Sequence, residues 1–207
     1  MDEVIILGGG GHAKVLIDCI LSTGEFRIKG ILDPRREAGS SLLDIPVLGG
    51  DEFLEGPDAK GFALALGVGT VKASDVRKNI FEKHTGKGFQ FPSFVHREAY
   101  AAKSSDIRNG AQVMAGAVIQ AAAFIGEDVI VNTSAVIEHD CKIGAHCHIS
   151  PGAVLGGNVE VGECSHIGLG ARVLQGVKIG RNVTVAAGAV VISDVPDSKT
   201  VMGVPAR

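Results

Sequence analysis

A histidine followed by an aspartate is the pair in this chain best suited to proton transfer. His139 is adjacent to Asp140, and a carboxylate at one nitrogen of an imidazole fixes its tautomer and stabilises its protonated form. Histidine also changes charge in the neutral pH range, so it can accept a proton from an attacking amine or hydroxyl. We therefore take His139 and Asp140 as the candidate catalytic pair.

A run of four glycines near the amino terminus is a candidate phosphate site. Apolar residues 4–7 precede Gly8 and an apolar helical pattern follows His12, which indicates a strand, a glycine turn and a helix. Backbone N–H groups at such a helix start, with no side chains in front of them, suit an anion. The spacing Gly8-x-Gly10-x-x-Ala13 also fits the looser dinucleotide fingerprint. Asp33 ends the next predicted strand, where an acid could contact a ribose.

The size of this region favours a nucleotide diphosphate over NAD as its ligand. About 90 residues supply one mononucleotide-binding half, whereas a dinucleotide is gripped by two. The simplest alternative is a tight turn that binds nothing.

The residues that must position His139 repeat in sixes. The first residue of each hexad is aliphatic without a break in phase, from Ile107, Val113 and Ile119 through to Val191, and the fifth is small or β-branched. A period of six predicts a parallel β-helix, in which each short strand turns one aliphatic side chain inward and three hexads complete a triangular coil.

Residues that differ by three hexads stack in columns along such a helix. His139 lies between Ala121 and Gly157 in its column, so two minimal neighbours leave a notch beside its ring. His148 and His166 share a second column, which makes His148 a further candidate for contact with a ligand.

Residues 1–92 are predicted to form a small α/β domain, because short apolar runs alternate with helical patterns. Strands are expected over residues 4–7, 27–32, 62–66 and 88–91, with a short extension over 45–48 and a second helix over 74–84. The fold class is an α/β half-Rossmann domain, residues 1–92, followed by a parallel β-helix, residues 93–207.

Composition excludes several classes of function. The chain has 20 basic and 23 acidic residues, a net charge of −3, which offers nothing to attract nucleic acid. It starts without a cationic signal region and has no apolar run long enough to cross a membrane. Its four cysteines form no CxxC pair, and Cys141 and Cys147 fall on inward hexad positions, so we expect a reduced, cytoplasmic setting.

The chain resembles one family along essentially its whole length. The motifs are the glycine turn with His12, Leu32-Asp33, Leu66-Gly67, the run 132–140 and the closing run 203–207. It is similar to the hexapeptide-repeat acyltransferases of the sialic-acid O-acetyltransferase-like and nucleotide-sugar N-acetyltransferase family, which act on UDP-4-amino-sugars or perosamine. The resemblance implies a left-handed β-helix, acetyl-CoA as co-substrate, no metal, and a homotrimer with coenzyme A between adjacent subunits.

The resemblance also assigns residues to roles. The catalytic pair falls on His139 and Asp140. Contacts to the nucleotide sugar fall on Gly8, Gly10, Gly11, His12, Asp33, Gly67 and Asn132. Contacts to acetyl-CoA fall on His148, Gly157, Leu169, Ala187, Pro205, Ala206 and Arg207. The segment after Gly67 departs from the family, which commonly has an Asn or Asp where this chain has Val68-Gly69-Thr70.

The expected activity is N-acetylation of the amine of a nucleotide-linked 4-amino-4,6-dideoxysugar, with His139 as general base and no acyl-enzyme. Four alternatives stay open. The first is O-acetylation of a sialic acid or another sugar. A zinc enzyme of the γ-carbonic-anhydrase type could use His139, His146, His148 and His166. The others are a nicotinamide oxidoreductase and a non-catalytic nucleotide-sugar sensor.

Overall fold

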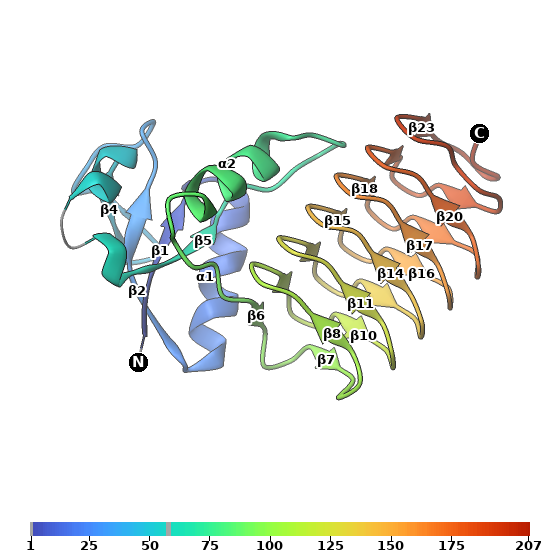
Figure 1. Ribbon diagram of the computed structural model, residues 1–207, viewed down its shortest axis with the longest axis horizontal. Coiled ribbons are helices and arrows are strands. Elements are labelled where there is room, and N and C mark those ends of the chain that lie inside the picture. Colours follow the sequence, from blue (N-terminus) through green and yellow to red (C-terminus); the bar gives the residue numbers. More distant parts are fainter. Residues whose placement is uncertain (1, 57–58) are drawn as a thin grey trace.

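A computed structural model describes residues 2–56 and 59–207 of the chain. Figure 1 shows two parts side by side, a small sheet with helices at the amino-terminal end and a prism of stacked coils that runs to the carboxy terminus. None of the helices in these described ranges is long and apolar enough to cross a membrane.

The amino-terminal part is a five-stranded sheet with the order β3-β4-β2-β1-β5. Its strands are β1 (Asp2–Leu7), β2 (Phe26–Leu32), β3 (Ser41–Leu42), β4 (Ile45–Gly49) and β5 (Ala63–Leu66). Its helices are α1 (Gly11–Thr23) and α2 (Val76–Thr85), with short 3₁₀ turns at Asp51–Glu55 and Ala59–Gly61. Strand β1 pairs in parallel with β2 and β5, so the loops that follow these three strands meet at one edge of the sheet.

The strand predicted over residues 88–91 is wrong. These four residues, all of them described, follow α2 as turn and extended chain, and only the carbonyl of Gln90 joins the sheet edge, by accepting the Leu64 N–H at 2.8 Å. Phe89 and Phe91 are buried against the sheet and Phe81, whose ring lies 4.7 Å from that of Phe91. The apolar pattern that suggested a strand therefore reflects aromatic packing.

The carboxy-terminal part confirms the predicted parallel β-helix. Two-residue strands repeat every six residues and stack in parallel on the strand 18 residues away, as in the pair Val136 and Val154. The seven-stranded face consists of β6 (Phe94–Val95), β9 (Gln112–Val113), β12 (Ile130–Val131), β15 (His148–Ile149), β18 (His166–Ile167), β21 (Thr184–Val185) and β23 (Thr200–Val201). The six-stranded face consists of β7 (Tyr100–Ala101), β10 (Val118–Ile119), β13 (Val136–Ile137), β16 (Val154–Leu155), β19 (Arg172–Val173) and β22 (Val190–Val191). The five-stranded face consists of β8 (Asp106–Ile107), β11 (Phe124–Ile125), β14 (Lys142–Ile143), β17 (Glu160–Val161) and β20 (Lys178–Ile179).

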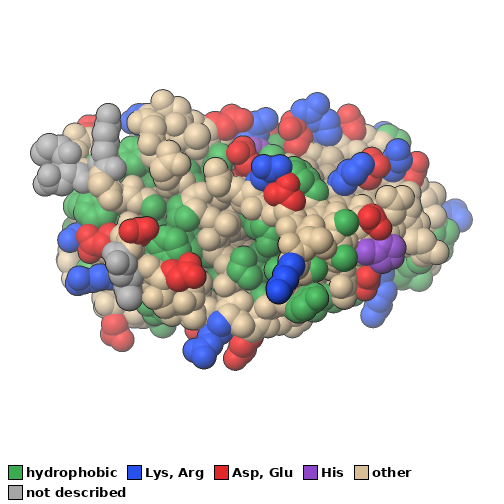
Figure 2. Space-filling view, turned by 60° about the horizontal axis from the view of Figure 1, so that its bottom comes forward, with side chains coloured by type: hydrophobic (Ala, Val, Ile, Leu, Met, Phe, Trp, Pro, Cys, Tyr) green, Lys and Arg blue, Asp and Glu red, His purple; other side chains and the backbone are tan. Residues whose placement is uncertain are grey.

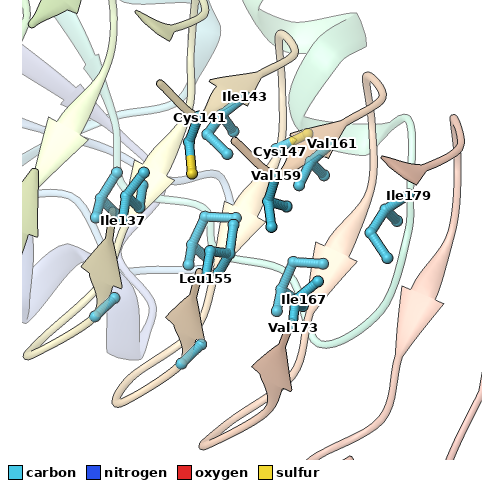
Figure 3. Close-up of a cluster of buried hydrophobic side chains, with 14 of the residues drawn as sticks. Ile137, Cys141, Ile143, Cys147, Leu155, Val159, Val161, Ile167, Val173 and Ile179 are labelled. Carbon is cyan, nitrogen blue, oxygen red and sulfur yellow. The ribbon is translucent and has the colours of Figure 1, made fainter. Parts of the chain in front are cut away.

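The inside of the prism is the aliphatic ladder that the hexads predict. Figure 3 shows side chains of successive coils, among them Ile137, Leu155 and Val173, stacked in one cluster. Cys141 and Cys147 point into the same cluster and are fully buried, so they are packing residues. Burying a ladder of this kind is the main stabilising contribution for a solenoid.

The corners need a left-handed residue once per hexad. The positions 128, 134, 140, 146, 158, 164 and 182 all have φ between 55° and 60° without being glycine. This conformation favours Asn and Asp over other residues with a Cβ, which explains why Asp140 suits the corner that carries His139.

The seven-stranded face is covered by the amino-terminal part except at its last coil, where Thr200 is exposed. Its outward residues Gln112, Ile130, His148 and His166 are all buried. Figure 2 shows one side of the whole molecule, on which acidic and basic side chains intermix with small hydrophobic patches.

Candidate active site

A cleft of about 550 Å³ lies between the glycine turn and the seven-stranded face of the β-helix. Its walls come from the two parts of the chain, and they bring together six of the residues predicted to contact a nucleotide sugar. These are Gly8, Gly10, Gly11, His12, Gly67 and Asn132. The cleft is also lined by Val15, Arg35, Val68, Gly69, Thr70, Val71, Thr133, His148 and Pro151.

The glycine turn leaves the first N–H groups of α1 open to a ligand. Gly10 occupies the position before the helix and has no side chain to cap it, and no described atom lies within 4 Å of a Cβ built on Gly10 or Gly11. Gly8 has φ of 93° and passes so close to Val68 that a Cβ would lie 2.7 Å from the Val68 side chain. The turn thus presents unblocked donors at the positive end of a helix of 13 residues.

Asp33 holds the turn in place. Its carboxylate accepts the Gly9 N–H at 2.8 Å and the Arg35 N–H at 2.9 Å. Burial acts to raise the pKa of Asp33, but the Gly9 and Arg35 N–H groups, together with the Arg35 side chain, outweigh it and lower the pKa below its ordinary value. Asp33 does not line the cleft, so its direct contact to a ribose stays a prediction. Sequence reasoning missed Arg36, whose Nε donates to the Gly9 carbonyl at 2.8 Å.

His12 is a neutral hydrogen-bond donor to the β-helix. Gln112 donates its amide N–H to the Leu66 carbonyl at 3.0 Å, which turns the Gln112 Oε1 towards His12. The Nε2–H of His12 donates to this oxygen at 2.8 Å, so Nδ1 carries the lone pair. Burial, reinforced by the Arg77 charge, lowers the pKa of His12 to about 4.

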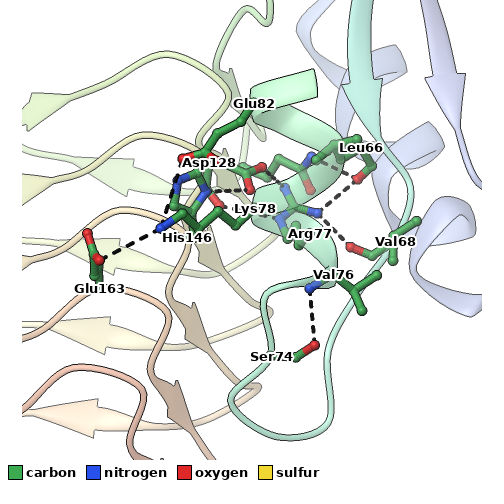
Figure 4. A network of polar contacts seen from close by, with 11 residues as sticks. Leu66, Val68, Ser74, Val76, Arg77, Lys78, Glu82, Asp128, His146 and Glu163 are labelled. Carbon is green, nitrogen blue, oxygen red and sulfur yellow. Dashed lines mark hydrogen bonds and ion pairs between the residues drawn. The ribbon is translucent and has the colours of Figure 1, made fainter. Parts of the chain in front are cut away.

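Arg77 fixes the loop that forms the far wall of the cleft (Figure 4). Its guanidinium, fully buried, donates to the carbonyls of Leu66 at 3.1 Å and Val68 at 2.6 Å, on either side of Gly67. Its charge is balanced by Asp128 at 2.7 Å, and Asp128 also contacts the Nδ1 of His146 at 3.1 Å. His146 is thus part of the joint between the two parts of the chain. No local sequence pattern indicates Arg77, because its partners come from two other segments, residues 66–68 and Asp128 of the β-helix.

His148 lies in the cleft with both ring nitrogens engaged. Its Nε2 is 3.0 Å from the Asn132 amide nitrogen, and its Nδ1 is 3.0 Å from the Thr70 hydroxyl. The His166 ring packs edge-on against it, with centroids 5.0 Å apart. Burial, with smaller effects from neighbouring His166, His12 and Arg77, lowers the pKa of His148 to about 3. His148 is therefore neutral at physiological pH.

His139 and Asp140 form the predicted pair on a different edge of the prism. The Nδ1 of His139 lies 2.7 Å from the Asp140 carboxylate, and both side chains are about 60% exposed (61% and 60%). They occupy the turn between β13 and β14, where the six- and five-stranded faces meet, opposite the seven-stranded face that lines the cleft. A Cβ on Gly157 would lie 2.6 Å from the Nε2 of His139, so the ring lies directly against this glycine. This contact is expected for residues 18 apart in the sequence.

The residues predicted to contact acetyl-CoA fall into three places. His148, Leu169 and Ala187 line a groove of about 310 Å³ that shares Thr70 and Pro151 with the cleft. Gly157 lies under His139 on the other edge. The tail residues Pro205, Ala206 and Arg207 fold back onto the last coil, where Ala206 N–H donates to Val190 C=O and Arg207 pairs with Met202.

The four histidines proposed for zinc are not gathered into one site. His139 contacts Asp140, His146 contacts Asp128, and the other two are bonded to polar side chains. Within residues 2–56 and 59–207, no three His, Cys, Asp or Glu side chains are close enough to hold a metal ion.

Two family models match the chain. The PglD N-terminal domain matches residues 3–84, and the bacterial transferase hexapeptide (six repeats) matches residues 122–157. The comparison with curated proteins gives no match.

Solved structures resemble the whole chain. The acetyltransferase domain of PglB from Neisseria gonorrhoeae is 38% identical with a TM-score of 0.94, over 100% of this chain and 99% of that one. PerB from Caulobacter crescentus, solved with CoA and GDP-perosamine, is 39% identical with a TM-score of 0.91, over 100% and 97%. WeeI from Acinetobacter baumannii AYE is 25% identical with a TM-score of 0.87, over 100% and 99%.

The fold, the cleft and these relatives define an acyltransferase of the hexapeptide-repeat class. Within that class, the chain belongs to the family that joins a PglD-type N-terminal domain to a hexapeptide-repeat acetyltransferase domain. The resemblance identified from the sequence is thereby confirmed.

Proposed function

We propose that this enzyme transfers the acetyl group of acetyl-CoA to the amine of a nucleotide-linked 4-amino-4,6-dideoxysugar. The observation that carries the proposal is the cleft, which joins the open N–H groups of the glycine turn to Asn132 and His148 of the β-helix. The α/β part, residues 1–92, holds the nucleotide diphosphate on the turn. The β-helix, residues 93–207, holds acetyl-CoA along the groove of Leu169 and Ala187. The complex of PerB with CoA and GDP-perosamine supports this pairing of ligands.

His139 is the general base. Asp140 accepts the Nδ1–H, which leaves the lone pair on Nε2. As the sugar amine attacks the thioester carbon, Nε2 takes a proton from the amine nitrogen and the C–S bond breaks. The departing thiolate of CoA then receives a proton from the imidazolium. Base catalysis of this kind contributes roughly 10²–10⁴-fold.

Direct transfer needs no acyl-enzyme, and the chain has no thiol suited to form one at this site. Cys141 and Cys147 point into the prism, and burial raises the pKa of the Cys147 thiol to about 12. A thiol in this state is a poor nucleophile.

His148 serves acetyl-CoA as a hydrogen-bond acceptor. Its Nε2 faces the amide N–H of Asn132, so this nitrogen has the lone pair and Nδ1 has the proton. The Asn132 amide occupies this lone pair, so an amide N–H of the pantetheine arm takes the place of the Asn132 N–H when acetyl-CoA binds. The thioester oxygen, which gains negative charge, is then left to backbone N–H groups.

The two halves of this site come from different subunits of a homotrimer. His139 lies on the edge opposite the cleft of its own chain, so a neighbouring subunit must bring its own copy. The six-stranded face, which ends at the His139 edge, is suited to the contact because five of the six residues in its outward row are apolar. These five are Tyr100, Val118, Val136, Val154 and Val190, and the sixth is the exposed Arg172.

Thiol release from acetyl-CoA tests the function. The acceptors are UDP-, GDP- and dTDP-linked 4-amino-4,6-dideoxysugars, with sialic acid in parallel. Release with one amino sugar, reduced about 10²–10⁴-fold by His139→Ala with nucleotide-sugar affinity kept, is the expected result. Release with sialic acid alone would move the assignment to O-acetylation.

Mixed trimers test the shared site. His139→Ala and Asn132→Ala are each expected to be inactive, because one lacks the base and the other a wall of the cleft. Co-expressed and purified together, they form interfaces at which an intact His139 meets an intact cleft, and activity returns. No recovery from a trimer verified by sedimentation would refute a site built from two subunits.

A further inference from the structure

A chain of hydrogen bonds runs from the β-helix through the amino-terminal part and back. The Asn132 amide nitrogen lies 3.0 Å from the Nε2 of His148, whose Nδ1 lies 3.0 Å from the Thr70 hydroxyl. The same hydroxyl lies 3.3 Å from the Nδ1 of His166, whose Nε2 lies 3.2 Å from the Ser150 hydroxyl. Only Thr70 belongs to the amino-terminal part, in the loop after β5 that Arg77 holds. Among the described residues, its hydroxyl is the one group that is hydrogen-bonded to both histidine rings.

Asn132 determines which group donates and which accepts in the first two hydrogen bonds. The Oδ1 of Asn132 accepts the backbone N–H of Thr133 at 2.8 Å, so its NH₂ group must face His148. The Nε2 of His148 is then the acceptor, and its Nδ1–H donates to the oxygen of Thr70.

Thr70 connects the hydrogen bonds of His148 to those of His166. The Thr70 oxygen accepts the Nδ1–H of His148, and its own O–H can point at the Nδ1 of His166, 3.3 Å away. In this arrangement the proton of His166 is on Nε2, where it donates to the Ser150 hydroxyl at 3.2 Å. The two stacked histidines therefore carry opposite tautomers, His148 protonated on Nδ1 and His166 on Nε2.

We propose that Thr70 is a positioning residue: by accepting the Nδ1–H of His148 it keeps the Nε2 of His148 an acceptor when acetyl-CoA takes the place of Asn132, and its O–H sets the tautomer of His166. A hydroxyl is the side-chain group that can accept from one ring and donate to the next through a single atom. Since the loop of Thr70 also lines the nucleotide-sugar side of the cleft, the same residue connects the two substrate sites. This inference rests on the proposed function for the identity of the ligand, but the tautomers do not depend on it.

The tautomers are measured first, by ¹⁵N NMR of the histidine rings in the unliganded wild-type protein at pH 7.5. The signals of His148 and His166 are assigned by their loss in His148→Asn and His166→Asn. The expected spectrum has His148 as the Nδ1–H form and His166 as the Nε2–H form. The same tautomer in both rings would overturn the proposal, whatever the enzyme acetylates.

Variants of Thr70 test the functional consequence. Thr70→Val keeps the shape but removes the hydroxyl, so it is expected to change the His148 signal and to raise KM for acetyl-CoA about tenfold, the factor that one hydrogen bond supports, with kcat within about twofold. Thr70→Ser is expected to restore both. Lys72→Ala, an exposed change on the same loop, is the matched control and keeps wild-type values.

Two results would overturn the role of Thr70 while leaving the proposed function intact. One is a normal KM for acetyl-CoA in Thr70→Val. The other is a KM in Thr70→Ser as high as in the valine variant, because the effect would then follow from shape. Absence of thiol release from the wild-type enzyme with every acceptor would instead refute the proposed function, and the NMR result would stand by itself.

Discussion

Replacement of Gly157 by alanine is expected to disable the catalytic base without unfolding the protein. The Cβ of the alanine would lie 2.6 Å from both Cε1 and Nε2 of His139, whereas an ordinary contact needs about 3.5 Å. The obstacle is the exposed ring of a side chain, which can swing outward into solvent. Gly157 has no left-handed φ, so its backbone accepts a side chain without strain.

The size of the effect follows from the displacement. Relief of the contact moves the reactive edge of the imidazole by about 1 Å, and a misplacement of that size costs about 10²-fold in rate. The corresponding rise of the activation barrier is about 2.7 kcal/mol. The loss should fall on kcat, with KM for the nucleotide sugar unchanged, because the cleft does not include Gly157.

The neighbouring glycine supplies the matched control. A Cβ on Gly156 would lie 2.7 Å from the backbone nitrogen of Gln175 in the next coil, which cannot move aside. Gly156→Ala should therefore lower the Tm, whereas Gly157→Ala should keep the Tm and lose turnover. Thiol-release kinetics and thermal melts of both variants separate the two cases. A wild-type kcat for Gly157→Ala, or a Tm as low as that of Gly156→Ala, would refute the reasoning.

Three further predictions concern charges. Arg77→Met leaves the buried Asp128 without the arginine charge that balances it and should cost about 3–5 kcal/mol in urea unfolding. Lys83→Met, at an exposed ion pair, should cost at most about 1 kcal/mol, and equal losses would contradict the burial argument. Asp140→Asn keeps the corner geometry but removes the charge that orients His139, so kcat should fall about 10²–10⁴-fold and return in part with Asp140→Glu. Since the pKa of His148 is about 3 when folded and 6.5 when unfolded, its contribution to stability is complete above pH 6.5 and is lost as the pH falls towards 3. The urea midpoint should accordingly fall less between pH 7.5 and pH 5 in His148→Asn than in the wild type.

The hexad phase made most of the β-helix predictable from the sequence. A repeat of fixed length determines which side chains point inward and which residues stack, so the contact of His139 with Gly157 follows from their spacing of 18 residues alone. The column of His148 and His166 is also as predicted. In the α/β part, the same local reasoning located the glycine turn, but it took the buried Phe89 and Phe91 for a strand.

Contacts between the two parts could not be predicted, because they depend on how the parts dock. Gln112 shares the column of His148, so its outward position follows from the repeat. That it binds both His12 and the Leu66 carbonyl follows only from the position of the α/β part on that face. The ion pair of Arg77 and Asp128 likewise depends on how the two parts dock, so the sequence alone could not predict it.

Burial divides the histidines of the site between two kinds of role. A general base must become charged during each turnover, and the proposed base His139 is 61% exposed beside the Asp140 carboxylate, where its charged form is solvated and paired. His12 and His148 have a pKa of about 4 and about 3 because they are buried, so at neutral pH they stay uncharged, each with one fixed donor and one fixed acceptor. Such rings can position a substrate through hydrogen bonds, but they cannot take up a proton from it at neutral pH. The environment of each ring thus favours His139 over the other two as the base, independently of the resemblance to known acetyltransferases.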